Sequence, residues 1–209
     1  MKRYDVINEL IDEYGYVSYL EIGTQSAENL KQVQCDFKVG IDPEPAIDDT
    51  ARYCDRFYRM TSNGYFSTYK RKHLFDIVFI DGLHHYPQVI MDFQHVLNCL
   101  LEGCCVVVHD CNPQSEEAQE FPYKHTSTWN GNVWRAWLRL RYDYNMKMFV
   151  VDTDQGCGVI FPYIVGGKPL RHEYTLRQIE TMSYQEFANN REKLLNLISV
   201  DEFSEYIQV

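Results

Sequence analysis

Polar side chains that could do acid–base, metal or nucleotide chemistry stand at the ends of short apolar runs in this sequence. In an open parallel sheet, the carboxyl ends of the strands share one edge, and ligands bind there. If these runs are strands of one such sheet, their polar residues should converge at that edge. The candidate residues are Glu21, Gly23, Asp42, Asp81, His84, His109 and Asp110.

The two aspartates Asp81 and Asp110 suggest a cation site. Each ends an apolar run, and the two runs follow one another along the chain. Two carboxylates at one strand edge repel each other unless a cation or a proton lies between them. Oxygen ligands of this kind suit Mg²⁺, Mn²⁺ or Ca²⁺, and His109 could add a nitrogen ligand. His84 is either a functional residue of this edge or a solvated residue at the start of a helix, and His85 is interpreted as solvated.

The first two runs suggest a nucleoside site. Gly23 allows a sharp turn and a close approach of a ligand to the backbone. Asp42 follows 19 residues later, where a carboxylate can accept hydrogen bonds from both hydroxyls of a ribose. The alternative is an aspartate that starts an ordinary Asp-Pro turn. A nicotinamide site is disfavoured, since only the first glycine of a G-x-G-x-x-G loop is present.

The spacing of apolar residues indicates the elements that position these side chains. Strands are expected near residues 18–23, 37–42, 57–61, 75–81 and 104–110. The run over 75–81 is apolar enough for a strand buried on both faces. Between the last two runs, apolar residues spaced by three and four predict a helix from Tyr86 to Leu100. Alternating strands and helices predict parallel βαβ units.

The alternation of apolar runs and helical segments stops near the end of the sequence. Residues 146–152 and 157–161 are apolar runs joined by a short turn, which predicts an antiparallel hairpin. Residues 1–162 are therefore expected to form a doubly wound α/β domain, and residues 163–209 a helical appendage packed on it. In the appendage, Ser183 and Glu186 form a capping-box pattern. The helix that follows should carry Phe187, Leu194, Leu195 and Ile198 on one face, which packs on the sheet, on a second copy of the chain or over the mouth of the site.

Composition excludes several classes of protein. The 209 residues carry a net charge of −10, which disfavours binding to nucleic acid or to anionic membranes. No apolar run approaches the ~20 residues of a membrane span. Seven scattered cysteines without a C-x-x-C pair indicate reduced thiols and a cytoplasmic protein. Trp134 and Trp137 share a helical face and are expected in the core.

Taken together, these motifs resemble class I S-adenosylmethionine (SAM) dependent methyltransferases. The segment Asp81-Gly-Leu-His84-His-Tyr86, followed by His109-Asp110, is similar to the branch that contains macrocin-type sugar O-methyltransferases. The resemblance covers roughly residues 15–162. It implies a Rossmann-like, mostly parallel, seven-stranded sheet that ends in an antiparallel hairpin.

The resemblance also implies roles for individual residues. Glu21 and Gly23 would line the methionine end of SAM, Asp42 would hold the ribose, and Ser62 and Asn63 would lie by the adenine. Asp81 would lie near both the methionine and a divalent cation such as Mg²⁺. The cation ligands would be Asp81, His109 and Asp110, and the catalytic base would be His84. The acceptor would be a small hydroxylated molecule such as a sugar.

Two other interpretations remain open on the sequence. Ala27 stands where the family usually has a second glycine, and His109 stands where macrocin-type members have an acid. These differences favour a SAM-binding protein without turnover. A metal-dependent hydrolase could use Asp81, His84, His109 and Asp110, but it would leave Asp42 and the Gly23 loop without a role.

Overall fold

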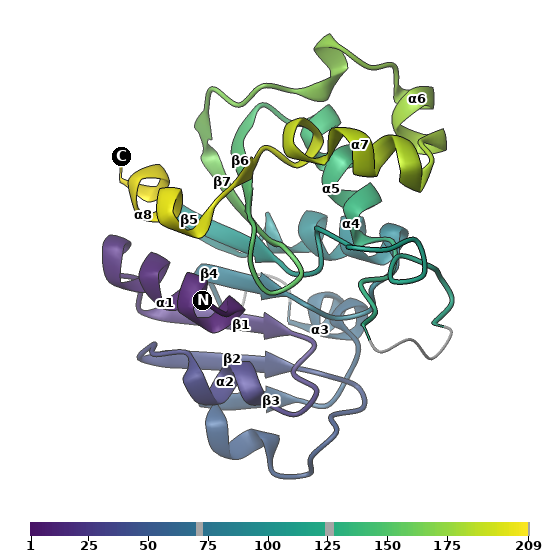
Figure 1. Cartoon of the computed structure of the whole chain (residues 1–209). Helices are drawn as coiled ribbons and strands as arrows, with labels where there is room; N and C mark the ends of the chain where they lie inside the picture. Colours follow the sequence, from purple (N-terminus) through teal and green to yellow (C-terminus); the bar gives the residue numbers. More distant parts are fainter. Residues whose placement is uncertain (70–72, 124–127, 209) are drawn as a thin grey trace.

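A computed structural model describes residues 1–69, 73–123 and 128–208. One eight-stranded sheet runs through the molecule in the order β3-β2-β1-β4-β5-β7-β6-β8 (Figure 1). Its strands are β1 (Ser18–Ile22), β2 (Phe37–Ile41), β3 (Arg56–Tyr58), β4 (Phe75–Ile80), β5 (Leu100–Val108), β6 (Met146–Val151), β7 (Cys157–Val165) and β8 (Leu197–Ile198). The first five are parallel, and β7 runs antiparallel to both β5 and β6. The doubly wound α/β fold and its antiparallel hairpin are thereby confirmed.

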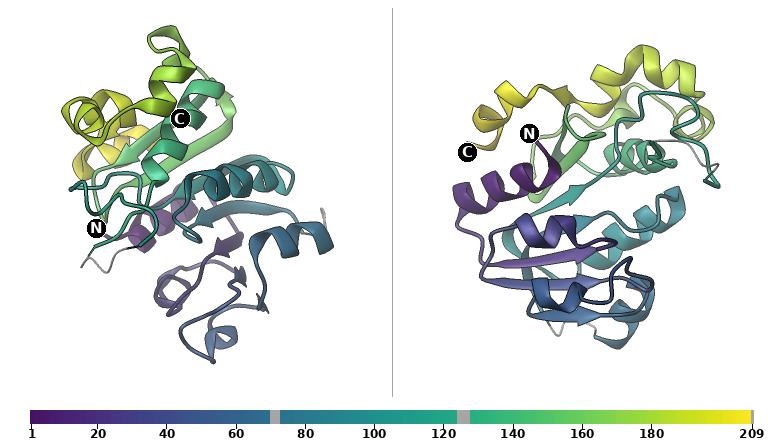
Figure 2. Two further views of the ribbon diagram at one scale, coloured as in Figure 1. Left: turned by 90° about the vertical axis from the view of Figure 1, so that its right-hand side faces the viewer. Right: turned by 60° about the horizontal axis from the view of Figure 1, so that its bottom comes forward.

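Helices cover both faces of the sheet (Figure 2). One face packs against α1 (Arg3–Tyr14), α2 (Glu28–Gln32) and α8 (Val200–Ile207). The other packs against α3 (Ser62–Thr68), α4 (Tyr86–Val96), α5 (Val133–Asp143), α6 (Leu176–Thr181) and α7 (Tyr184–Leu195). The short 3₁₀ turns η1 (Thr50–Tyr53) and η2 (Leu170–His172) complete the elements. Because strands such as β4 touch helices on both sides, they are mostly apolar.

The appendage contributes a strand as well as helices. The predicted capping box is present, since the Ser183 hydroxyl accepts from the Glu186 amide and the Glu186 carboxylate accepts from the Ser183 amide. Phe187, Leu194 and Leu195 are buried. Ile198 was expected on this helix, but the helix ends at Leu195, and Ile198 lies in β8 beside β6. The sheet therefore has eight strands rather than seven.

Two further boundaries differ from expectation. The helix predicted to reach Leu100 ends at Val96, and Leu100 begins β5 beside Phe75. Leucine suits a buried helix and a buried strand equally, so the apolar spacing alone could not place it. The tryptophans Trp134 and Trp137 are fully buried, as predicted. All seven cysteines are free thiols.

No helix within the described residues combines the length and the apolar content of a membrane span.

Candidate functional site

The loops that leave the carboxyl ends of β1 and β4 touch each other. Gly23 follows β1 with a positive φ of 87°, and a Cβ atom there would lie 2.1 Å from the carbonyl oxygen of Asp81. Only glycine fits so close an approach of two backbones. Since the strand order reverses between β1 and β4, this contact lies at the switch point where open α/β sheets bind ligands.

The carboxylate of Glu21 lies deep beside this loop. Its Oε2 accepts hydrogen bonds from the Tyr19 hydroxyl at 2.5 Å and from Asn29 Nδ2 at 3.0 Å, and the residue is only 1% exposed. Burial raises the pKa of Glu21 to about 8, against these two hydrogen bonds, which lower it. Glu21 therefore carries a proton at neutral pH, and its contact with a cofactor stays a prediction.

Asp42 joins the loops that follow β1 and β2. Its Oδ2 accepts from the backbone amides of Thr24 at 2.9 Å and Gln25 at 2.8 Å, and its Oδ1 accepts from the amide of Glu44 at 2.8 Å. Both carboxylate oxygens thus already accept hydrogen bonds from backbone amides. The carboxylate is at the predicted place, and its bond to a ribose stays a prediction.

Ser62 and Asn63 begin α3 after β3 and meet a side chain from α4. Gln88 Nε2 lies 3.3 Å from Ser62 Oγ, 3.2 Å from Asn63 Oδ1 and 2.9 Å from Asp92 Oδ1. Asp92 is almost fully buried, and burial raises its pKa. The sequence did not indicate Gln88 as part of the site. The predicted role of Ser62 and Asn63 beside an adenine is untested by these contacts.

The structure brings Asp81, His84 and Asp110 together as a group that could hold a metal ion. The Nε2 atom of His84 lies 3.3 Å from Asp81 Oδ1 and 3.2 Å from Asp110 Oδ2. Adjacent ligands around an octahedral Mg²⁺, bound at 2.0–2.1 Å, are roughly 3 Å apart. These spacings therefore fit one small divalent cation.

His109 lies on the buried side of the same carboxylates. Its Nδ1 is 3.2 Å from both Asp81 Oδ1 and Asp110 Oδ2, and its Nε2 is 2.7 Å from the carbonyl oxygen of Asp154 in the β6–β7 turn. His109 was predicted as the third ligand and His84 as the base. The group of residues that could hold a metal ion contains His84 beside the two aspartates. The roles predicted for His84 and His109 stay predictions.

Opposite charges attract one another within this cluster of Asp81, His84, His109 and Asp110. Burial lowers the pKa of each histidine, but the two carboxylates outweigh burial, and the pKa of His84 is raised and that of His109 is raised strongly. Burial raises the pKa of Asp81, but the charge of His109 outweighs it, and the pKa falls well below its usual value. The two carboxylates thus favour the protonated, positively charged form of each histidine.

The loop between β5 and α5 forms an aromatic wall beside the cluster, made of Phe121, Tyr123 and Trp129. The Trp129 ring stacks on His84 with centroids 4.8 Å apart, and the Phe121 ring stacks on His85 at 4.2 Å. Tyr123 lies 5.1 Å from Trp129. The wall belongs to the segment of residues 111–130, and loops of this length in compact domains are often specificity loops. Its residues 124–127 lie outside the described part of the chain.

Asn130 is a site residue that the sequence did not suggest. It is fully buried, and its Nδ2 donates to Asp110 Oδ1 at 2.9 Å. Asp110 itself has a positive φ of 63°, a conformation that aspartate tolerates better than most residues. The Asn-Gly-Asn segment over residues 130–132, directly before α5, is the sequence signal that could have indicated it.

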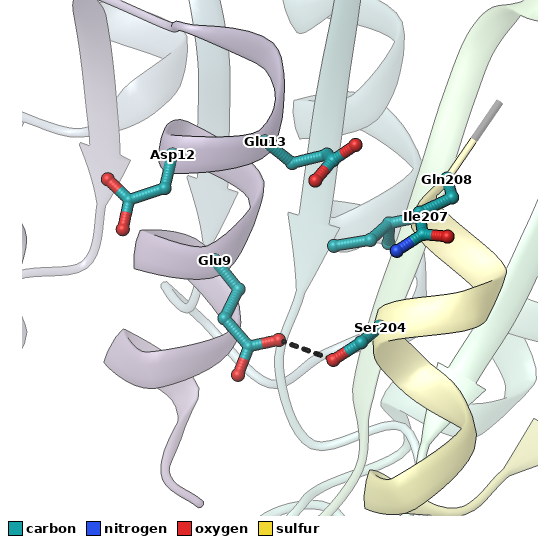
Figure 3. Close-up of a pocket in the computed structure, with 6 residues that line it drawn as sticks. All are labelled: Glu9, Asp12, Glu13, Ser204, Ile207 and Gln208. Carbon is teal, nitrogen blue, oxygen red and sulfur yellow. Dashed lines mark hydrogen bonds between the residues drawn. The ribbon is translucent and has the colours of Figure 1, made fainter.

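A separate pocket lies between α1 and α8 (Figure 3). Glu9, Asp12, Glu13, Ser204, Ile207 and Gln208 line it. The acidic residues come from the later turns of α1, which lead into the start of β1. The pocket therefore lies toward the amino edge of the sheet, away from the cluster of Asp81 and Asp110.

Comparisons with known proteins agree with this fold. Residues 20–111 match a family model described as a methyltransferase domain. A search of curated protein sequences finds no match.

Solved structures of similar fold include several methyltransferases. The O-methyltransferase TomG from Streptomyces achromogenes, crystallised with SAM, has a TM-score of 0.57 at 18% identity over 78% of this chain and 80% of its own. An O-methyltransferase from Bacillus cereus, in complex with SAH, has a TM-score of 0.54 at 15% identity over 76% and 78%. The SAH-bound methyltransferase PaMTH1 from Podospora anserina has a TM-score of 0.59 at 12% identity over 76% of each chain.

Proposed function

We propose that this protein transfers a methyl group from SAM to a hydroxyl oxygen of a small metabolite. The proposal starts from the match to a methyltransferase domain and from the class I, SAM-dependent fold. In this reaction the methyl carbon leaves the sulfonium sulfur, a C–O bond replaces the C–S bond, and S-adenosylhomocysteine (SAH) is released. The hydroxyl proton passes to a base or to water. The observation that carries the proposal is the Asp81–His84–Asp110 group at the edge of the sheet where such folds bind ligands.

We assign Asp81, His84 and Asp110 to a divalent cation. A cation bound there would act as a Lewis acid and lower the pKa of an acceptor hydroxyl. The orientation of His84 supports the assignment, because its Nδ1 lies 3.3 Å from the carbonyl oxygen of Trp129. With a cation bound, a proton on Nδ1 would donate to that carbonyl and leave the Nε2 lone pair to bind the cation between the two carboxylates.

The base role predicted for His84 requires the same Nε2 atom to be free of a cation. The two roles therefore differ in their response to metal. As a ligand, His84 contributes to metal affinity and activity together. As a base without metal, it contributes roughly 10²–10⁴-fold to turnover in the presence of chelator.

The aromatic wall supports a ring-shaped acceptor. Phe121 is 39% exposed, and its neighbour Trp129 stacks directly on His84. A pyranose presents an apolar C–H face that packs on an aromatic ring while its hydroxyls reach toward polar groups. Together with the resemblance to macrocin-type enzymes, this favours a sugar or sugar-derived acceptor.

Three measurements test the proposal. Calorimetry should show binding of SAH to the wild-type protein. Titration with Mn²⁺, followed by electron paramagnetic resonance, should show one site that weakens in Asp81→Asn, His84→Gln and Asp110→Asn. His85→Gln is the matched control, since His85 is adjacent in sequence but stacks on Phe121 instead of facing the carboxylates. Its Mn²⁺ affinity should equal that of the wild type.

A panel of free and nucleotide-linked sugars, scored by SAH release, then tests the acceptor class. SAH binding without turnover on any hydroxylated acceptor would favour the binding-protein interpretation. Failure to bind SAH at all would overturn the proposal.

A further inference from the structure

We infer that Arg3 and Asp81 form a receptor for the zwitterionic amino-acid end of the cofactor, with Arg3 binding the carboxylate and Asp81 the ammonium group. The inference rests on the SAM dependence proposed above. No motif in the sequence pointed to Arg3, which lies 78 positions before Asp81.

Arg3 is held in place by the β6–β7 turn. It is the first residue of α1, and its Nη1 donates to Asp154 Oδ2 at 3.1 Å. The backbone amide of Arg3 donates to the same oxygen, also at 3.1 Å. These two bonds fix the guanidinium from one side and leave its opposite edge for another partner.

That opposite edge is formed by Nε and Nη2, and no hydrogen bond from it is found within the described residues. Nε is buried and has no hydrogen-bond partner among the described residues. The nearest carboxylate oxygens lie too far for hydrogen bonds: Asp81 Oδ2 is 3.9 Å from Nε, and Glu28 Oε2 is 3.8 Å from Nη2. A buried donor without an acceptor costs free energy. An edge with two parallel N–H groups is the geometry that binds a carboxylate in bidentate fashion.

The edge formed by Nε and Nη2 lies at the switch point of the sheet. Asp81 directly follows β4 and lies next to the Gly23 loop that follows β1. The two oxygens of Asp81 have different surroundings, since Oδ1 lies near His84 and His109 whereas Oδ2 lies near Arg3. Asp81 therefore stands between the cation group and Arg3.

The charges at this point match an α-amino acid. A ligand carboxylate alone would meet Asp81 and Glu28 as well as Arg3, and the like charges would repel it. A zwitterion places its carboxylate on the guanidinium and its ammonium group on Asp81, so each charge meets its opposite. Methionine-derived ligands such as SAM and SAH carry this group, whereas nucleosides without an amino acid do not.

The test compares two ligands and two proteins by calorimetry. SAH carries the amino-acid carboxylate, and S-adenosyl-3-thiopropylamine is the same molecule without it. The wild type should bind SAH about 10- to 100-fold more tightly than the amine, as expected for a charge-assisted bidentate contact. In Arg3→Met the affinity for SAH should fall by that factor, while the affinity for the amine should change by less than about twofold.

Lys2→Met is the matched control. Lys2 also pairs with Asp154, at 3.1 Å, but its side chain is 60% exposed, and no contact with Asp81 is described. Both ligands should bind this variant as they bind the wild type. If Arg3→Met does not fold, Arg3→Lys, which keeps the charge without the fork, should show a reduced but measurable preference for SAH.

The outcomes separate this inference from the proposed function. A wild type that binds neither ligand overturns the proposed function. A wild type that binds both equally, or an Arg3→Met variant that weakens both by the same factor, leaves SAM dependence intact and refutes the carboxylate contact.

Discussion

Replacement of Glu21 by glutamine should stabilise the protein at neutral and alkaline pH. Glu21 is 1% exposed, and its hydrogen-bond donors are the Tyr19 hydroxyl and Asn29 Nδ2. Glutamine keeps the shape of the side chain and one acceptor oxygen for these donors. Asn29 Oδ1 is buried and has no hydrogen-bond partner in the described part of the chain, so the same cluster also offers an acceptor to the new amide group.

The sign follows from the pKa of Glu21, which burial raises from 4.5 to about 8 in the folded protein. Between these values the folded state keeps a proton that the unfolded state loses. The contribution of Glu21 to the free energy of unfolding is therefore fully present below pH 4.5, and it is lost as the pH rises toward 8. At about 1.4 kcal/mol per pKa unit, the loss at pH 7 relative to pH 4 is on the order of 3 kcal/mol.

Urea unfolding of the ligand-free protein from pH 4.5 to 8.5 measures this loss. The difference in unfolding free energy between Glu21→Gln and wild type should grow with pH across the range. Glu13→Gln removes an exposed carboxylate from α1 and should track the wild type at every pH. A Glu21→Gln variant that also tracks the wild type would show that Glu21 is not buried in its neutral form, and the reasoning would fail.

Three further predictions concern other parts of the fold. Asp42→Asn replaces a carboxylate that holds three backbone amides, so it should cost about 1–3 kcal/mol in urea unfolding and weaken SAH in calorimetry; unchanged SAH affinity would remove Asp42 from the ribose site. Gly158→Ala would place a Cβ atom 2.3 Å from the ring of buried Trp137, and thermal unfolding should show a loss of at least about 1–3 kcal/mol. Ser199→Ala removes the capping box of α8 and should cost about 1 kcal/mol by the same assay; no change would mean that the cap is not formed in solution.

The sequence was most informative where a pattern is set by local burial. A strand buried on both faces is mostly apolar, and β4 and the second half of β5 were recognisable for that reason. Parallel strands end at one edge, so the convergence of Asp81 and Asp110 followed from the order of the elements. Neither inference needed any knowledge of distant contacts.

Other features depend on contacts that a linear pattern does not encode. Leu197 and Ile198 form a strand only because the edge of β6 is free to pair with them. The oxygens of Asp42 are engaged by loop amides whose positions the spacing of residues could not reveal. Arg3 meets Asp154 across 151 positions of the chain.

The β6–β7 turn shows how topology brings an unmarked segment into the site. The turn at Asp154 and Gln155, with φ of 44° and 70°, was interpreted as a simple connection between two strands. Since β7 is antiparallel to β5, Gly158 at its start pairs with Val108 at the end of β5. The turn before β7 therefore lies at the carboxyl edge, beside the polar residues that follow the parallel strands. There the carbonyl oxygen of Asp154 meets Nε2 of His109, and its carboxylate holds Arg3. If β7 were parallel to β5, the turn before β7 would lie at the opposite edge of the sheet. The antiparallel direction of β7 therefore allows one turn to orient both His109, beside the candidate cation ligands, and Arg3, which we assign to the cofactor.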